Sequence, residues 1–388
     1  MLPLIEAILN GISIGSVLLI AALGLAIVFG LMGVINLAHG ELMMIGAYTT
    51  FVVQNILKPL GEPFFNIYIF IAIPVAFVVA ALAGLILEKG VIKFLYGRPL
   101  ETLLATWGVS LILRQFVRSV NGSMAIGLSI FCLLFFGGMF ILSRRPNWKQ
   151  IRSKFIAITL PLAGAIALIT GILINQSKNK SLTLPWFSAR NVDVTAPEWL
   201  RGGIPLGAFQ FPIARVFIII LTILCLAGVY WFLNGTDWGL KIRAVTQNRT
   251  MSSCLGIPTA TVDAITFALG SGLAGVAGVA ISLLGSVGPN TGQNYIVDAF
   301  MVVVVGGVGN LLGSIIAALA IGTISYIVGS GTLGLILMSQ ESLTPVLDIV
   351  NFFATTSMAK VLVFVMIIAF LQVKPSGIFP QKGRTAEL

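Results

Sequence analysis

Long apolar stretches recur along the whole chain, and polar residues gather in the short segments between them. Such stretches match the roughly 20 residues with which a helix crosses a hydrocarbon core of about 30 Å. We therefore expect an all-α, polytopic membrane protein with about 9 to 11 transmembrane helices, some of them short or broken. The expected spans are residues 6–31, 40–57, 64–88, 100–118, 125–142, 155–174, 212–233, 259–285, 294–308, 311–329 and 357–373.

The amino-acid composition also indicates a protein that is embedded in the lipid bilayer. Only 9% of the residues are charged and 57% are hydrophobic, whereas soluble proteins carry about 25% charged residues. The spans leave no room for a sizeable soluble domain, so residues 1–388 are expected to form a single transmembrane domain. The net charge of +10 comes from Lys and Arg in loops, a pattern that orients membrane proteins and does not indicate nucleic-acid binding.

Basic residues in the short loops predict the orientation in a bacterial inner membrane. Most of them fall on one side, in segments 89–98, 144–154, 241–249 and 374–384. Cytoplasmic loops are enriched in Lys and Arg, so this side and the C-terminus are expected in the cytoplasm. With an odd number of spans, the N-terminus is expected in the periplasm.

Two glycine-interrupted segments resemble each other. Gly33-Val34-Ile35-Asn36-Leu37 leads to Gly40, and Gly307-Val308-Gly309-Asn310-Leu311 leads to Gly313. Paired broken helices in the two halves of a transporter mark its solute pathway, which makes Asn36 and Asn310 candidate pathway residues. Alternatively, the glycines and asparagines simply cap two helix ends. A separate run, Gly272, Gly275 and Gly278, predicts close helix packing.

The polar residues of the second span are not accompanied by the other functional groups that catalysis requires. His39 is the only histidine of the chain, and no paired carboxylates, nucleophile with a base, or metal-binding cluster accompanies it. We expect no enzymatic activity, metal or other cofactor. His39 can donate a hydrogen bond to a neighbouring helix or to a solute. Glu41, near the start of a span, suits the positive end of a helix dipole.

The fourth span carries hydroxyl groups at helical spacing. Thr102, Thr106 and Ser110 stand four residues apart, with Trp107 beside them. These four side chains are candidates for the pathway of a neutral solute rich in N–H and C=O groups. The alternatives are ordinary hydrogen bonds between helices for the hydroxyls and a place at the membrane interface for Trp107.

A polar segment between two spans, residues 234–258, is expected in the cytoplasm. Gly239, Arg243 and Gln247 stand four residues apart, so a short helix would present a basic and amide face to a docked partner. A loop that only sets orientation is the alternative. A stand-alone channel or carrier would need no such docking segment.

Three motifs in order resemble those of permeases of the branched-chain amino acid type of ABC importers. They are Gly33–Glu41, Gly239–Ala244 with Leu255-Gly256-Ile257, and Gly306–Gly313, and the resemblance covers roughly residues 1–118 and 205–380. It implies that residues 234–258 form the loop that couples the permease to the ATPase. The implied coupling residues are Gly239, Lys241, Arg243, Ala244, Gln247, Arg249 and Gly256. ATP is expected on partner subunits, because this chain has no phosphate-binding loop motif.

Within that family the chain is most similar to the urea-transport branch, through segments 98–108, 288–295 and 374–384. This resemblance implies a urea importer, with short amides as further solutes, built from a periplasmic solute-binding protein, two different permeases and two ATP-binding subunits. Branched-chain amino acids are the alternative solutes; their carboxylate and ammonium groups would require a charged partner in the pathway. Residues 122–180 depart from the compact family pattern and are expected to be an inserted transmembrane hairpin.

Overall fold

The computed structural model describes residues 2–143, 148–176, 186–187, 190–206, 209–332, 334 and 354–379. Apart from one short β-hairpin, the regular structure of these residues is helical, which confirms the expected all-α, polytopic class. The chain divides into two compact units, Met1–Leu111 with Val192–Leu388, and Ile112–Asn191. The basic residues expected at 144–145 and 382–384 lie outside the described residues.

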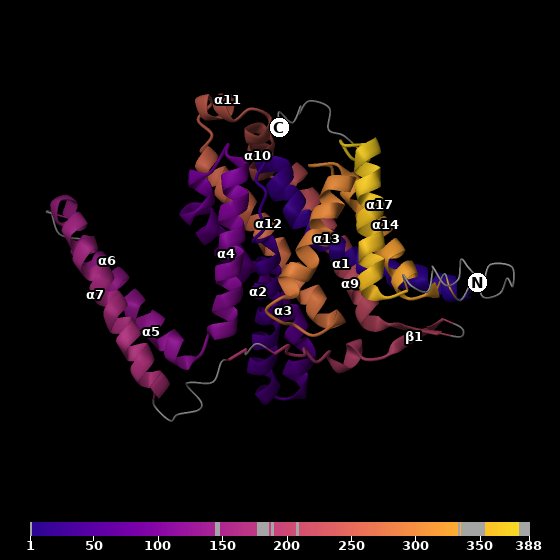
Figure 1. Cartoon of the computed structure of the whole chain (residues 1–388), viewed down its shortest axis with the longest axis horizontal. Coiled ribbons are helices and arrows are strands. Elements are labelled where there is room, and N and C mark those ends of the chain that lie inside the picture. Colours follow the sequence, from indigo (N-terminus) through magenta and orange to yellow (C-terminus); the bar gives the residue numbers. More distant parts are fainter. Residues whose placement is uncertain are drawn as a thin grey trace. The chain divides into compact units, whose positions relative to one another are not determined.

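The first unit contains most of the helices (Figure 1). Its long helices are α1 (Leu2–Met32), α2 (His39–Leu57), α3 (Glu62–Gly90), α9 (Ile213–Gly235), α12 (Thr259–Leu284), α13 (Thr291–Gly306), α14 (Leu311–Gly329) and α17 (Thr356–Val373), and α4 (Pro99–Ser119) continues into the second unit. Its short elements are η1 (Lys58–Leu60), η2 (Ile92–Phe94), η4 (Glu198–Leu200), α10 (Asp237–Gln247), α11 (Arg249–Cys254), β1 (Gly203–Leu206) and β2 (Phe209–Pro212).

Six described helices are long and apolar enough to cross a membrane, within Pro3–Met32, Glu62–Phe94, Phe155–Ile174, Ile213–Gly235, Thr259–Leu284 and Leu311–Gly329. Other expected spans coincide with helices that are shorter or more polar. Helix α13 has 16 residues, and α4 carries charges at both ends. Helix α2 begins with polar residues that are buried inside the protein. These helices bury their polar groups against neighbours, so hydropathy alone describes them poorly.

Helices α1 and α12 form the centre of the first unit. About four fifths of each membrane-length window is buried, whereas the buried share is 28% for α3, 22% for α9 and 33% for α14. The outer helices present large apolar side chains such as Ile86 and Leu224 outward, 74% and 63% exposed. In a bilayer such faces contact lipid tails, because there is no water in the hydrocarbon core to penalise them.

Glycines bring the central helices into backbone contact. A Cβ atom added to Gly46 of α2 would overlap the backbone of Gly275 of α12. One added to Gly278 would overlap the carbonyl oxygen of Met43, and one added to Gly24 of α1 would overlap that of Gly270. Small residues at helix interfaces allow this approach. The expected packing role of the glycine run in α12 is therefore confirmed.

Residues 192–206 and 209–212 lie across one end of this unit (Figure 1). The Tyr68 hydroxyl of α3 donates to the Thr195 carbonyl at 2.9 Å, and the Trp199 indole donates to the Asn66 carbonyl at 2.8 Å. Strands β1 and β2 follow as an antiparallel hairpin that leads into α9. Figure 1 shows β1 at one end of the unit and α10 with α11 at the other. We call these the hairpin end and the α10 end.

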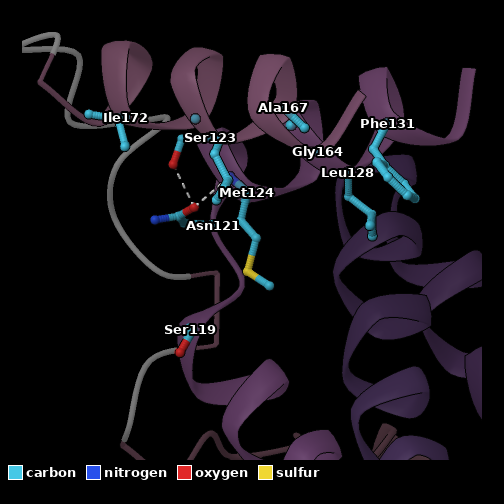
Figure 2. Close-up of a pocket in the computed structure, with 12 residues that line it drawn as sticks. Ser119, Asn121, Ser123, Met124, Leu128, Phe131, Gly164, Ala167 and Ile172 are labelled. Carbon is cyan, nitrogen blue, oxygen red and sulfur yellow. Dashed lines mark hydrogen bonds between the residues drawn. The ribbon is translucent and has the colours of Figure 1, made fainter. Parts of the chain in front are cut away.

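The second unit contains α5 (Gly122–Cys132), a π-helical turn (Leu133–Gly137), α6 (Gly138–Ser143) and α7 (Trp148–Gln176). The expected span 125–142 is thus interrupted. The side chain of Asn121 starts α5 by accepting from the Met124 N–H and the Ser123 hydroxyl, both at 2.8 Å. Figure 2 shows these bonds at the edge of a cavity of about 470 Å³ lined by α5 and α7.

We expect Gly275→Ala to destabilise the protein, because the new methyl group would overlap the Ala76 carbonyl oxygen and the Ala80 side chain. Overpacking costs typically about 1–3 kcal/mol, visible as a lower thermal unfolding temperature of the purified protein. Gly108→Ala is the matched control, since no atom lies within 4 Å of the added Cβ, and we expect no loss. Equal unfolding temperatures for the two variants would contradict the packing role.

Candidate functional site

The chain leaves the helical conformation between α1 and α2, and we call residues 33–38 the first break. Gly33 has φ +68°, a left-handed conformation that favours glycine. The Asn36 Oδ1 atom accepts from the Ala38 N–H at 3.0 Å. Asn36 is buried, and its Nδ2 atom has no hydrogen-bond partner among the described residues. The break therefore contains an unused amide donor.

His39, three residues after Asn36, supplies an unused hydrogen-bond acceptor. Its Nε2 atom lies 3.0 Å from the carbonyl oxygen of Ala21 in α1. Because a carbonyl oxygen only accepts, Nε2 carries the proton, and Nδ1 of the neutral ring is an acceptor. The ring is fully buried, and Nδ1 has no partner in the described part of the chain. Asn36 Nδ2 and His39 Nδ1 are thus one buried donor and one buried acceptor without a hydrogen-bond partner among the described residues.

Helix α4 holds the first break through two of its predicted residues. The Thr106 hydroxyl oxygen accepts from the Leu37 N–H at 3.2 Å, and the Ser110 hydroxyl donates to Glu41 Oε1 at 2.9 Å. The Thr102 hydroxyl is 3.0 Å from the Leu95 carbonyl oxygen and 2.9 Å from that of Arg98. These bonds match the alternative in which hydroxyls join neighbouring segments.

Trp107 does not share this surface. Thr102, Thr106 and Ser110 are buried, whereas Trp107 is 53% exposed. One residue along a helix turns the side chain by about 100°, and this places Trp107 on another face of α4. Trp107 therefore lies apart from the buried surface that the three hydroxyl residues share, and its place in the pathway stays a prediction.

The second break, residues 307–310, lies against the end of α1. Gly307 and Gly309 have φ values of +100° and +82°. A Cβ atom on Gly30 would overlap the Cα of Gly309, so the second break contacts α1 three residues before the first break begins. The Asn310 Oδ1 atom accepts from the N–H groups of Leu312 and Gly313, at 3.1 and 3.3 Å. Asn310 thus caps α14.

Gly239 allows the sharp turn from α9 into α10. The Thr236 hydroxyl oxygen accepts from the Gly239 N–H at 3.1 Å and caps α10. A Cβ at Gly239 would overlap the carbonyl oxygens of Phe232 and Leu233, and the residue is buried. Gly239 therefore shapes the segment from inside. The sequence had instead placed it on the face presented to a partner.

Helix α10 packs on the end of α1. Ile242 and Val245 are buried in a cluster that includes Leu31 of α1 and Val262 of α12. The Thr246 hydroxyl also lies 3.2 Å from the Leu31 carbonyl oxygen, two residues before Gly33. A displacement of α10 would therefore act directly on the first break.

An exposed face of mixed character covers α10 and α11. Arg243 is exposed and donates to Asn234 Oδ1 at 3.1 Å, and Gln247 is exposed as well. The docking face, as we name it, consists of Leu240, Arg243, Gln247, Met251 and Leu255, whose three apolar members are 62%, 59% and 75% exposed. Sequence reasoning missed these apolar residues; the signal was apolar side chains within a polar, basic segment.

The other predicted coupling residues have contacts within the chain. The Lys241 ammonium lies 4.7 Å from the centre of the Trp238 ring, and Ala244 is half-buried. Gly256 has φ +79°, and its N–H donates to the Ser253 carbonyl at 3.0 Å. It therefore terminates α11, as glycine commonly does after a helix.

Arg249 contacts two other segments. Its guanidinium lies 2.6 Å from Asp263 of α12 and 4.9 Å from the centre of the Tyr96 ring. The Tyr96 hydroxyl donates to Glu88 of α3 at 3.3 Å. Burial raises the pKa of Tyr96 above its ordinary range, which keeps this donor protonated. Arg249 thus connects α11 to α12 and to the segment of Tyr96 while its side chain stays 49% exposed.

Comparison with known proteins identifies the family of the chain. The model of a family described as "Branched-chain amino acid transport system / permease component" matches residues 7–371. The high-affinity branched-chain amino acid transport system permease protein LivH of Escherichia coli (strain K12) is 25% identical over 376 residues, 96% of this chain and 94% of that protein. The corresponding protein BraD of Pseudomonas aeruginosa is 24% identical over 321 residues, 82% of this chain and 84% of its own length.

The ribose import permease protein RbsC of Escherichia coli (strain K12) is 25% identical over 240 residues, covering 53% of this chain and 73% of that protein. No solved structure gives a significant match. The family match spans nearly the whole chain, including both breaks and the docking face. The chain therefore belongs to the family of branched-chain amino acid transport system permease components, and it is a multi-pass transport subunit and not an enzyme.

Proposed function

We propose that this chain is the membrane-spanning permease subunit of an ATP-driven importer in a bacterial inner membrane. The contact between α10 and the end of α1 carries the proposal, because it connects an exposed docking face to the buried first break. The relatives, whose names describe permease proteins of transport systems, support it. ATP binding belongs to partner subunits, since this chain has no phosphate-binding loop motif.

The docking face fits a protein partner better than lipid or water. Exposed Leu240, Met251 and Leu255 accompany the cation of Arg243, and apolar anchors beside Arg are typical of the buried centre of protein interfaces. In the proposed mechanism the ATP-binding pair moves α10 and α11, and α10 moves the end of α1. The α10 end then faces the cytoplasm, and the hairpin end faces a periplasmic solute-binding protein.

The solute crosses beside the two breaks in this mechanism. Asn36 Nδ2 and His39 Nδ1 offer one donor and one acceptor to a passing molecule. Thr106 and Ser110 hold the surrounding backbone and Glu41, while Asn310 fixes the start of α14. A second, different permease subunit would complete the pathway across from this chain, as in importers built from two permeases.

We propose urea as the solute. Segments 98–108, 288–295 and 374–384 resemble the urea-transport branch of the family. Urea combines one carbonyl acceptor with four N–H donors and has no charge, so it matches an amide donor and a ring acceptor without an ionic partner. Short amides have the same groups.

Branched-chain amino acids are the second candidate, and the names of the relatives favour them. LivH and BraD are named as high-affinity branched-chain amino acid transport system permease proteins. Their zwitterionic solutes need charged or strongly polar partners along the pathway, because a buried charge without a partner is costly. A stand-alone channel for either solute would leave the docking face without a role.

Replacing Leu240 by Ser together with Arg243 by Ala should weaken the complex with the ATP-binding subunits. Loss of central interface residues commonly costs about 1–3 kcal/mol, or roughly 5- to 150-fold in affinity. Co-purification and solute-stimulated ATP hydrolysis measure this effect. Lys93→Ala is the control, because Lys93 is an exposed basic residue outside the docking face. Unchanged coupling in the double variant would refute the docking role.

Deleting the gene should abolish uptake of labelled urea at low concentration, and the intact gene should restore it. Excess unlabelled leucine should leave this uptake unchanged, because a site for a neutral amide does not bind a zwitterion well. Persistence of urea uptake together with loss of leucine uptake would refute urea and favour the second candidate. Uptake by the purified chain alone in vesicles, without ATP, would refute the importer itself.

A further inference from the structure

A cavity of about 600 Å³ lies among α1, α9, α12, α13, α14 and α17. Its walls combine polar groups from Arg215, Asp298, Tyr326 and Lys360 with apolar ones from Leu18 and Leu284. Small-molecule sites typically have volumes of about 300–1,000 Å³ and a few convergent polar groups in an apolar wall. Neither the family description nor the first break accounts for this cavity.

Arg215 keeps unused hydrogen-bond donors in this cavity. Its guanidinium donates to Asn10 Oδ1 of α1 and lies 5.8 Å from the centre of the Tyr326 ring of α14. Both partners are uncharged, and no carboxylate pairs with Arg215 among the described residues. Because a guanidinium has five N–H donors, several remain for a ligand.

Asp298 supplies the opposite charge on α13. Its carboxylate lies 3.0 Å from the Lys360 ammonium of α17, and its side chain is only 14% exposed. The Lys360 ammonium also donates to the Asn294 carbonyl at 3.2 Å. The cavity thus contains two cations and one carboxylate. The surplus positive charge is at Arg215, where a low-dielectric surrounding strengthens attraction to an oxygen acceptor.

The position of the cavity suits the entry of solute. Arg215 is the third residue of α9, which has 23 residues and is therefore about 33 Å long. Helix α10 follows the other end of α9, so Arg215 and the docking face are separated by nearly the thickness of a bilayer. In the proposed importer this places the cavity at the periplasmic, hairpin end.

We propose that this cavity is a solute-binding site in which Arg215 binds the solute's oxygen and Asp298 accepts from its nitrogen. The inference rests on the proposed importer function and names the solute class: a small molecule with a carbonyl or carboxylate oxygen near N–H groups. A neutral amide such as urea and an α-amino acid share this chemistry. They differ in the charge that faces Arg215, and Arg215 is therefore the specificity-determining residue.

The Arg215→Gln variant distinguishes a neutral amide from an α-amino acid as the solute, because glutamine keeps a hydrogen-bond donor and loses the charge. In the complete transporter reconstituted in vesicles, KM for urea should rise about 2- to 10-fold if the solute is neutral. KM for leucine should rise about 10- to 100-fold if the solute has a carboxylate, and Arg215→Lys should restore part of that loss. The maximal rate per assembled transporter should change less than KM in either case.

Arg201→Gln is the matched control. It removes the same positive charge. Arg201 is near the same end of α9, because the carbonyl of the next residue, Gly202, accepts from the Ile213 N–H. Arg201 does not line this cavity. We expect wild-type KM for this variant. If the Arg215→Gln variant fails to assemble, the Arg215→Lys variant tests the site instead. A KM of the Arg215→Lys transporter above the wild-type value supports the site.

Wild-type KM in a well-assembled Arg215 variant would overturn the site and leave the importer intact. Absence of ATP-dependent uptake of both solutes by the wild-type transporter would overturn the importer, and the site with it. A fall in maximal rate with unchanged KM would show a structural role of Arg215 and would also overturn the inference.

Discussion

Backbone contact between helices at glycines is the constraint on which the first unit depends. In lipid, apolar side chains gain little by leaving one apolar surrounding for another, so helices associate through close packing and hydrogen bonds. Gly24, Gly46, Gly275 and Gly278 provide that closeness between α1, α2 and α12. With these helices at the centre, α3, α9 and α14 bury a much smaller share of their residues within the chain.

Helix α1 connects the two regions of functional interest. Near its beginning, Asn10 accepts from Arg215 at the wall of the cavity. At its other end, Leu31 accepts from Thr246 just before the first break. The middle of α1 is almost entirely buried and packed against α12 and α14. A densely packed element transmits displacement because it has little free volume to absorb it.

The sequence predicted those elements whose structure is determined by residues close together along the chain. Apolar length predicted most helices, and glycine spacing in α12 predicted close packing, because both act over a few turns. The asparagines of the two breaks were also recognised, and each bonds backbone within three residues of itself. Long-range contacts were beyond such reasoning. Arg215 and Asn10 are separated by 205 residues, and nothing local in either segment indicates the other.

Errors within the site arose in the same way. The outward direction of Trp107 depends on what covers the opposite face of α4, which is the first break some 70 residues earlier. Gly239 resembles a surface residue in a polar segment, yet the preceding helix folds back and fills the space beside it. For Arg249 the coupling role stays a prediction: its guanidinium pairs with Asp263 of the next helix, a contact the sequence did not indicate, and its side chain is still 49% exposed.

The glycine contacts also determine where this chain can vary. An outward residue such as Ile86 is 74% exposed and has few neighbours within the chain, and acyl chains adapt to an apolar side chain of almost any shape. Gly46 and Gly275 face each other's backbone and leave no room for a single methyl group. Neutral drift should therefore accumulate on the lipid side of the outer helices, while the central helices change only when both surfaces of a contact change together.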